Sequence, residues 1–107
     1  MKLHFENQDI EDLILRHKSD FKLYKKLLKV KEFVNDLDKA IFILQNAPDA
    51  ASLSNFGKLR YEKLRHNLSG LSSIRIGFST KYRLLFRELD GGIEVVLIEI
   101  NEHYEDK

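Results

Sequence analysis

The sequence predicts an α+β domain in which two N-terminal helices pack on one face of a small, mostly antiparallel sheet of four or five strands. Two observations lead to this class. Apolar residues recur at helical spacing up to the single proline, Pro48, and the period changes to two after Gly57. Helices followed by a run of strands are typical of α+β domains. Because 107 residues suffice for one core, we expect a single domain over 1–107.

The first half begins with a short predicted strand over Lys2–Phe5, followed by two predicted helices near residues 8–18 and 21–46. Asn7 is suited to cap the first helix, and a Ser-Asp pair separates the two. The small, polar stretch over 49–57 is expected to be a loop. The second helix carries one apolar stripe, formed by Phe21, Tyr24, Leu28, Val34, Leu37, Ile41 and Leu44.

The second half shows the alternation of apolar and polar residues that is typical of strands. This alternation is clear over 73–78 and 82–87, and a weaker strand is predicted at 61–65. An Asp-Gly-Gly sequence at 90–92 predicts a tight hairpin turn. The final strand, 93–100, is apolar on both faces except for two glutamates, so we expect it inside the sheet.

Composition excludes several classes of function. The chain has no cysteine, which removes disulfides, thiolate metal sites and cysteine nucleophiles. Its two N-terminal-half histidines, His4 and His17, have no partner at ligand spacing, so we expect no metal site and no cofactor. The longest apolar run, Ala40–Leu44, is too short to span a bilayer, and no signal segment precedes it. We therefore expect a soluble, cytoplasmic protein without a membrane partner.

Charge is segregated along a chain whose formal net charge is only +1. Between Lys58 and Arg87 there are eight Lys or Arg residues and one acid, Glu62. Residues 16–31 contain seven basic residues and one acid, Asp20. Such segregation predicts a positive face on a nearly neutral molecule. The alternative is solvated charge that serves only solubility.

Three arginines are expected on the sheet face opposite the helices. If the apolar residues of strands 73–78 and 82–87 meet the helices, then Arg75, Arg83 and Arg87 project from the other face. Like charges on neighbouring strands repel unless water or an anion separates them. Because guanidinium groups match phosphate geometry, we regard all three as candidate phosphate-binding residues.

The same residues resemble the RelE/ParE toxin superfamily, most closely its YoeB-type members, with a secondary likeness to HigB-type toxins. The resemblance spans roughly residues 58–104 and agrees with the predicted order of elements. The matching segments are Glu62–Gly70, Ser73–Ile76, Tyr82–Arg87 and the pair His103-Tyr104.

This resemblance implies a toxin of a type II toxin–antitoxin pair that cleaves mRNA on the ribosome. The implied reaction is attack by the 2′-OH of the RNA, without a metal ion. The resemblance assigns Glu62 as general base and Arg83 to the scissile phosphate. It assigns His103 and Tyr104 as the general acid and a positioning group. These residue types suit the reaction, which needs a base, an acid and cations around a crowded phosphate.

The resemblance also implies further binding residues and partners. Arg65 and Arg75 match phosphate-contacting positions of the family, and His66 falls on its His-Asn position. Together with Arg87, they complete the candidate RNA-phosphate-binding set. The implied partners are a separate acidic antitoxin, the ribosome and mRNA, with a second copy of the chain as a further candidate.

Two other functions are open on the same fold. One is a ParE-type poison of DNA gyrase, and the other is a degenerate toxin that binds only its antitoxin. Each site residue also has a structural alternative. Glu62 is suited to neutralise neighbouring cations on the surface, and Arg83 to be an ordinary strand residue. His103 and Tyr104 form a plausible capping pair near the terminus.

Overall fold

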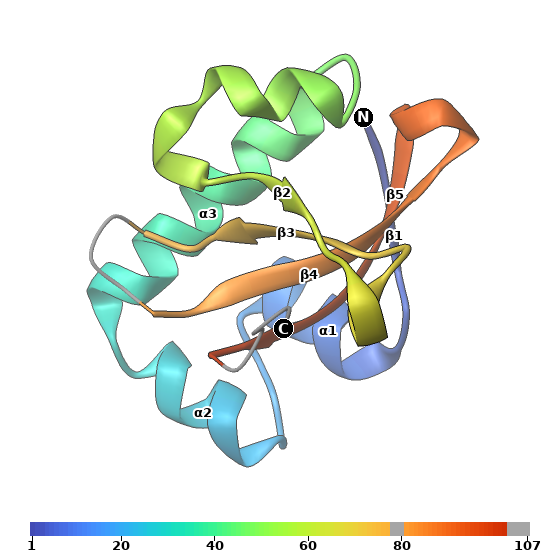
Figure 1. The fold of residues 1–107 in the computed structure, drawn as a ribbon. Helices are drawn as coiled ribbons and strands as arrows, with labels where there is room; N and C mark the ends of the chain where they lie inside the picture. Colours follow the sequence, from blue (N-terminus) through green and yellow to red (C-terminus); the bar gives the residue numbers. More distant parts are fainter. Residues whose placement is uncertain (78–80, 103–107) are drawn as a thin grey trace.

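The computed structural model describes residues 1–77 and 81–102, and within them three helices cover one face of a five-stranded sheet (Figure 1). The helices are α1 (Gln8–Arg16), α2 (Lys22–Leu28) and α3 (Lys31–Asn46). The strands are β1 (Lys2–Phe5), β2 (Glu62–Lys63), β3 (Ser72–Arg75), β4 (Arg83–Leu89) and β5 (Glu94–Asn101). The predicted α+β class is confirmed.

The strand order is β1-β5-β4-β3-β2. Only β1 and β5 pair in parallel, and the other three pairings are antiparallel, so the sheet is mostly antiparallel as predicted. β5 lies between β1 and β4, which agrees with its apolar residues on both faces. The turn Asp90–Gly92 joins β4 to β5, and its glycines have φ angles of 68° and 93° that side chains rarely adopt.

The predicted helix over 21–46 is two helices, which corrects the sequence-based boundary. Lys29 ends α2, and Val30 has extended backbone angles before α3 begins. A straight helix of that length would measure about 39 Å, whereas the largest extent of the molecule is 34 Å. The break also shifts the helical phase, so that Phe33 is fully packed in the core and Val34 is only partly buried.

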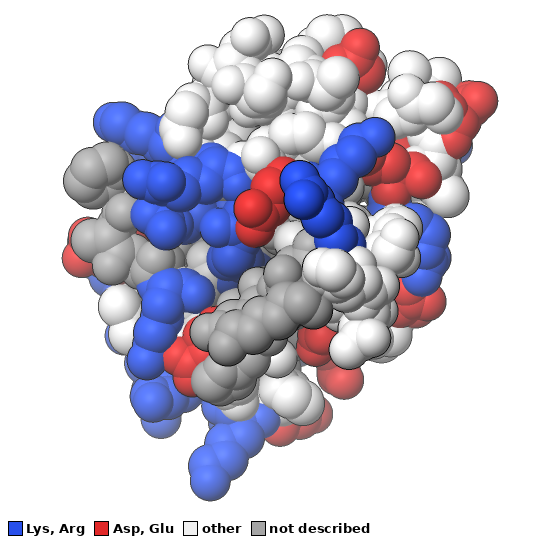
Figure 2. Space-filling view, in the orientation of Figure 1, with Lys and Arg blue, Asp and Glu red and all other residues white. Residues whose placement is uncertain are grey.

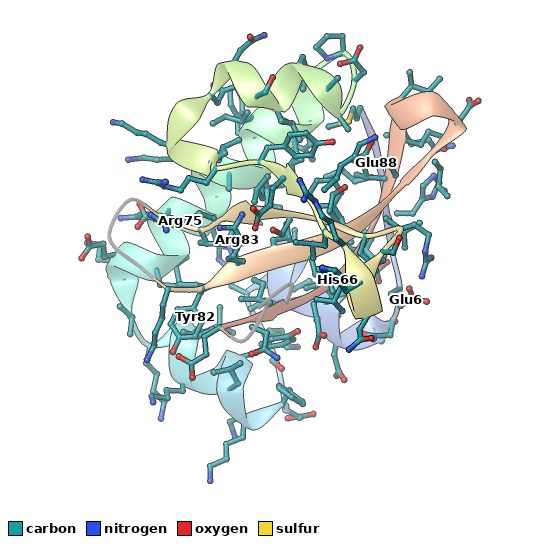
Figure 3. The ribbon with its side chains drawn as sticks, in the orientation of Figure 1. Glu6, His66, Arg75, Tyr82, Arg83 and Glu88 are labelled. Carbon is teal, nitrogen blue, oxygen red and sulfur yellow. The ribbon has the colours of Figure 1, made fainter. Side chains whose placement is uncertain are left out.

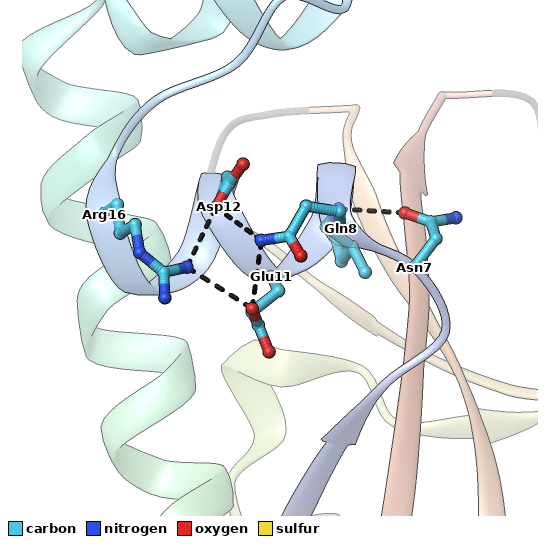
Figure 4. A network of polar contacts seen from close by, with 6 residues as sticks. Asn7, Gln8, Glu11, Asp12 and Arg16 are labelled. Atoms are coloured by element: carbon cyan, nitrogen blue, oxygen red, sulfur yellow. Dashed lines mark hydrogen bonds and ion pairs between the residues drawn. The ribbon is translucent and has the colours of Figure 1, made fainter.

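Side chains at both ends fix α1 (Figure 4). The Asn7 side-chain oxygen accepts a hydrogen bond from the Ile10 amide at 3.1 Å, which is the predicted N-cap. Asp12 accepts hydrogen bonds from Gln8 and Arg16, each at 2.8 Å. These contacts link side chains on the exposed side of α1, while Ile10, Leu13 and Ile14 on its other side are buried in the core.

The core lies between the helices and the sheet. It includes Ile74 of β3 and Leu84 of β4, both fully buried on the helix-covered face. Successive residues of a strand alternate in direction, so Arg75 and Arg83 project from the opposite, open face. This predicted orientation is confirmed.

The structure also differs from the predicted loop over 49–57 and from the predicted strand over 61–65. Short 3-10 helices occupy Ala51–Asn55 and Gly57–Leu59, and β2 contains only two residues. The amide of Ala50 donates to the Gly92 carbonyl at 2.7 Å, which fixes this segment to the β4–β5 turn. In residues 1–77 and 81–102, no helix has both the length and the apolar character needed to cross a membrane.

Candidate functional site

The predicted base and the predicted phosphate-binding arginine lie beside each other on the open face of the sheet. Glu62 of β2 places its Oε1 3.5 Å from Nη2 of Arg83 at the start of β4. The Glu62 side chain is 54% exposed, whereas that of Arg83 is 15% exposed. The pair therefore consists of an accessible Glu62 carboxylate beside a largely buried Arg83 guanidinium.

Hydrogen bonds hold the Arg83 guanidinium in one orientation. Its Nε donates to the hydroxyl of the buried Ser73 at 2.9 Å, across the β3–β4 pairing. Its Nη2 donates to the Arg60 carbonyl at 2.6 Å. Burial lowers the pKa of Arg83 from its ordinary value, and the neighbouring Glu62 carboxylate opposes that shift. The Glu62 charge thus offsets part of the cost of burying this cation.

The backbone at Arg60 is turned to make this contact. Arg60 has φ 47° and ψ 50°, a left-handed conformation that is uncommon for residues other than glycine. It directly follows the 3-10 helix Gly57–Leu59, and its amide donates to the Gly57 carbonyl. Strained residues of this kind concentrate at functional sites.

Arg75 supplies a second guanidinium next to Arg83 (Figure 3). The two residues are direct partners in the β3–β4 register, and the Arg75 charge contributes to lowering the pKa of Arg83. Within residues 1–77 and 81–102, no carboxylate forms an ion pair with Arg75. Two adjacent cations with one exposed carboxylate give this part of the face an excess of positive charge.

These side chains line an open depression of about 490 Å³. It is bounded by the 3-10 segments on one side and by the ends of β3 and β4 on the other. Its lining residues are Ser54, Phe56, Gly57, Arg60, Tyr61, Glu62, Arg75 and Arg83. An anionic ligand placed here would meet the two guanidinium groups and the Glu62 carboxylate together.

A partly buried polar cluster holds β2 in place. The Tyr61 and Ser72 hydroxyls each donate to Oε2 of Glu88 at 2.5 Å. Burial, followed by the Glu88 carboxylate, raises the pKa of Tyr61 above its ordinary value. The Tyr61 ring stacks on Phe86 with a centroid distance of 6.3 Å. Tyr61 is therefore fixed both by its ring and by its hydroxyl.

Arg65 and His66 lie on the other side of Glu62. They line a second open depression of about 510 Å³, together with Glu62, Lys63 and Leu64. Both are exposed, and His66 has a left-handed backbone with φ 53°. Glu62 borders both depressions, but His66 lies well apart from Arg75 and Arg83 (Figure 3).

Arg87 does not join the Glu62–Arg83 pair. Arg87 lies four positions further along β4, and its Nη2 is 3.4 Å from a Glu6 carboxylate oxygen. It is therefore neutralised at a different part of the face. His103 and Tyr104 lie outside the described residues, so their predicted roles stay predictions.

Basic side chains gather on one side of this face (Figure 2). They cover the ends of β3 and β4 and continue around α2, which contains three lysines and no acid in its first turn. Lys81 is partnered, since its Nζ lies 2.7 Å from Glu102. In the part of the chain that the structure describes, no group of three His, Asp or Glu side chains is placed to hold a metal ion.

Sequence reasoning missed three contributors to the site. The Arg60 carbonyl and the Ser73 hydroxyl orient Arg83, and Glu88 secures Tyr61 beside Glu62. Ser73 alternates with the apolar residues of its strand, which is a signal that it shares a face with the arginines. A backbone carbonyl carries no comparable signal in the sequence.

Comparison with known proteins gives structural matches only. No family model matches the chain, and no curated protein matches it significantly. A YoeB/ParE toxin from Agrobacterium tumefaciens superimposes with a TM-score of 0.60 at 20% identity, covering 97% of this chain and 100% of that one. The toxin–antitoxin complex RelBE2 from Mycobacterium tuberculosis gives a TM-score of 0.46 at 25% identity, with 94% of each chain covered.

The first of these similarities extends over the complete Agrobacterium chain and includes both the helical layer and the sheet. The likeness that the sequence predicted from residues 58–104 is thereby confirmed for the fold. This protein therefore shares the α+β fold of the Agrobacterium YoeB/ParE toxin, a RelE/YoeB-like fold.

Proposed function

We propose that the protein is the toxin of a toxin–antitoxin pair and cleaves mRNA bound to the ribosome. The observation that carries this proposal is the contact between Glu62 and Arg83, with Arg75 adjacent on the same open face. An exposed carboxylate beside one oriented guanidinium group and a second cation combines a proton acceptor with charge stabilisation for a phosphate. The fold shared with the Agrobacterium YoeB/ParE toxin supports this assignment.

In the proposed reaction, Glu62 accepts the proton of an RNA 2′-OH. The O2′ attacks the adjacent phosphorus, and the bond to the 5′-oxygen of the next nucleotide breaks. The products are a 2′,3′-cyclic phosphate and a 5′-hydroxyl, whose proton comes from His103. Arg83 and Arg75 neutralise the charge on the nonbridging phosphate oxygens. Tyr104 helps to position the scissile group.

The ion pair suggests how substrate binding prepares the base. A phosphate that binds Arg83 competes with Glu62 for the same guanidinium, since the Glu62–Arg83 separation is only 3.5 Å. Glu62 is exposed and belongs to a two-residue strand, whereas Arg83 is held by two hydrogen bonds. We therefore expect Glu62 to move away from the cation and toward the 2′-OH when RNA binds.

The basic face supports the remaining proposed contacts and partners. Arg65 and His66, beside Glu62, are suited to bind the RNA backbone on that side of the scissile phosphate. The same excess of positive charge would attract an acidic antitoxin. Its test is a search for a small reading frame adjacent to the gene, then co-expression with the product of that frame and affinity purification. A co-purifying acidic protein that abolishes toxicity is expected, and free growth without any such protein would contradict this partner.

A non-catalytic role is the second candidate, and one observation favours it. Arg83 donates to Ser73 and to the Arg60 carbonyl while it contacts Glu62, as a purely structural arginine would. In that case the chain binds its antitoxin without cutting RNA.

One experiment separates these functions. Purified protein is added to ribosomes programmed with a defined mRNA, and new mRNA 5′ ends are mapped by primer extension. Ribosome-dependent cuts that disappear in an Arg83→Ala variant are expected. Intact mRNA, together with DNA cleavage in a parallel gyrase assay, would instead identify a ParE-type poison. Inactivity in both assays would support the non-catalytic role.

A further inference from the structure

The depression beside Glu62 contains an aromatic side chain that the proposed chemistry does not use. Phe56 lies between the 3-10 helices Ala51–Asn55 and Gly57–Leu59, and it is 45% exposed. It lines the same depression as Arg75 and Arg83. An isolated exposed phenylalanine needs no explanation, but this one lines a site with an excess of positive charge.

The backbone of Phe56 is fixed although its side chain is exposed. Its amide donates to the Leu53 carbonyl at 3.0 Å, and its carbonyl accepts from the Leu59 amide at 2.9 Å. The residue is thus held by two consecutive turns. Because its backbone is already ordered, binding of a ligand costs less conformational entropy of the protein. An aromatic ring on a fixed backbone is a suitable platform for stacking.

The second aromatic residue of the depression is not available for stacking. Tyr61 already packs its ring against Phe86, and its hydroxyl is bonded to Glu88. Next to Phe56, Gly57 leaves the surface open, because an added Cβ would meet nothing within 4 Å. The depression thus combines one accessible ring, an open backbone segment and three arginines, Arg60, Arg75 and Arg83.

We propose that Phe56 forms a nucleobase-stacking subsite for the RNA nucleotide whose phosphate binds Arg75 and Arg83. A positively charged groove with an accessible aromatic ring is the combination by which proteins bind single-stranded nucleic acid. Because every base has a flat π-face, such stacking tolerates any sequence. This inference rests on the proposed function, since it takes RNA as the ligand, but it does not require that the RNA is cut.

The test uses oligonucleotides that cannot be cleaved. Two 2′-O-methyl RNA trinucleotides are compared, one with 2-aminopurine at the centre and one with an abasic centre. Wild-type protein should bind the base-containing probe about 5- to 150-fold more tightly than the abasic one. Stacking on Phe56 should also quench the 2-aminopurine fluorescence.

Three variants make the test specific. Phe56→Leu should abolish the preference for the base without changing affinity for the abasic probe. Phe56→Tyr should retain the preference, because it keeps a stacking ring. Phe42→Leu is the matched control, since Phe42 is 65% exposed on α3 and does not line the depression. It should bind both probes as the wild type does.

The results separate this subsite from the proposed cleavage. A preference for the base that survives in Phe56→Leu, or that is missing in the wild type, overturns the subsite even if mRNA is cut on ribosomes. A preference that disappears in Phe56→Leu alone supports the subsite even if programmed ribosomes show no cleavage. In that second case only the proposed nuclease activity fails.

Discussion

The hydroxyl of Tyr61 donates a 2.5 Å hydrogen bond to Glu88, and this contact ties the segment before β2 to the middle of the sheet. Tyr61 lies between Arg60 and Glu62, and both of these neighbours contact Arg83. Glu88 is only 17% exposed and accepts a second hydrogen bond from Ser72. A partly buried carboxylate away from the reacting groups thereby fixes the residues that surround the phosphate-binding arginine.

Removal of the Tyr61 hydroxyl should therefore affect both stability and the site. Tyr61→Phe keeps the ring that stacks on Phe86 but loses a hydrogen bond to a charged group, so it should cost about 1.5–3 kcal/mol in the free energy of unfolding. We also expect slower mRNA cleavage, and faster amide hydrogen exchange at Leu64, whose amide bonds the Leu71 carbonyl next to β2. Denaturant unfolding, single-turnover cleavage and exchange measured by NMR check these outcomes.

Tyr24→Phe is the matched control. In the wild type, the Tyr24 hydroxyl oxygen accepts a hydrogen bond from the Ile100 amide on the helix-covered side of the sheet. This variant should lose about 1 kcal/mol of stability and cleave at the wild-type rate. If Tyr61→Phe and Tyr24→Phe reduce cleavage equally, then Tyr61 acts only through overall stability.

The two adjacent arginines should differ when each is replaced by alanine. Arg83→Ala should abolish cleavage and also destabilise the fold by about 1–3 kcal/mol, because it leaves the buried Ser73 hydroxyl without its donor. Although Arg83 lies on the open face of the sheet, its side chain is only 15% exposed, so its loss should affect stability more than a typical surface substitution. Arg75→Ala should lower cleavage while stability stays within about 0.5 kcal/mol of the wild type.

Thermal unfolding and cleavage are measured on the same preparations. Removing Arg75 also removes repulsion that acts on Arg83, so a small rise in the midpoint of unfolding is consistent with the structure. A strongly destabilised Arg75→Ala variant would show that Arg75 stabilises the fold through a structural contact, which would contradict its role as a phosphate-binding residue that does not stabilise the fold.

A pH-dependent contribution to stability should come from the edge of the sheet. His4 of β1 lies 2.6 Å from Glu94 of β5, and this hydrogen bond lowers the pKa of Glu94 from its ordinary value of 4.5. A carboxyl whose pKa is lowered by folding stabilises the protein above its unfolded pKa and loses that effect as pH falls through the lowered value. The contribution should therefore be complete above about pH 4.5 and decline below it.

The measurement compares thermal unfolding of wild type and Glu94→Gln between pH 3 and 7. The two proteins differ only at this carboxyl group, so the difference between their curves reports on Glu94. The wild type should lose more stability than the variant as pH falls below 4.5. Parallel curves over the complete range would mean that the His4 contact contributes nothing in solution.

The fold was predictable because hydrophobic period is a local property of the sequence. The alternation of Ile74 and Leu84 with Arg75 and Arg83 correctly placed the arginines on the open face. The break at Lys29–Val30 was not predicted, because the apolar residues of 21–46 were assigned to one stripe. At 100° per residue, the apolar positions of 21–28 and of 34–44 fall on opposite sides of a continuous helix, and this change of phase is the local signal of the break.

The candidate site was predictable in part. A family resemblance named Glu62 and Arg83, and the structure brings them within 3.5 Å of each other. Strand alternation grouped Arg87 with Arg75 and Arg83 as a phosphate-binding candidate, but the distance along β4 and the Glu6 partner are properties of the folded chain. The backbone carbonyl of Arg60 escaped prediction for the same reason, since its direction depends on a left-handed backbone turn.

The central claim is that Glu62 accepts the 2′-OH proton next to a phosphate held by Arg83. Its most direct test is single-turnover cleavage of ribosome-bound mRNA by Glu62→Gln, which keeps the size and polarity of the side chain but removes the base. We predict a rate at least about 10²-fold below that of the wild type, with ribosome binding unchanged because Glu62 is exposed and outside the core. A Glu62→Gln variant that cleaves at the wild-type rate would contradict the account, because the base would then have to be a different residue.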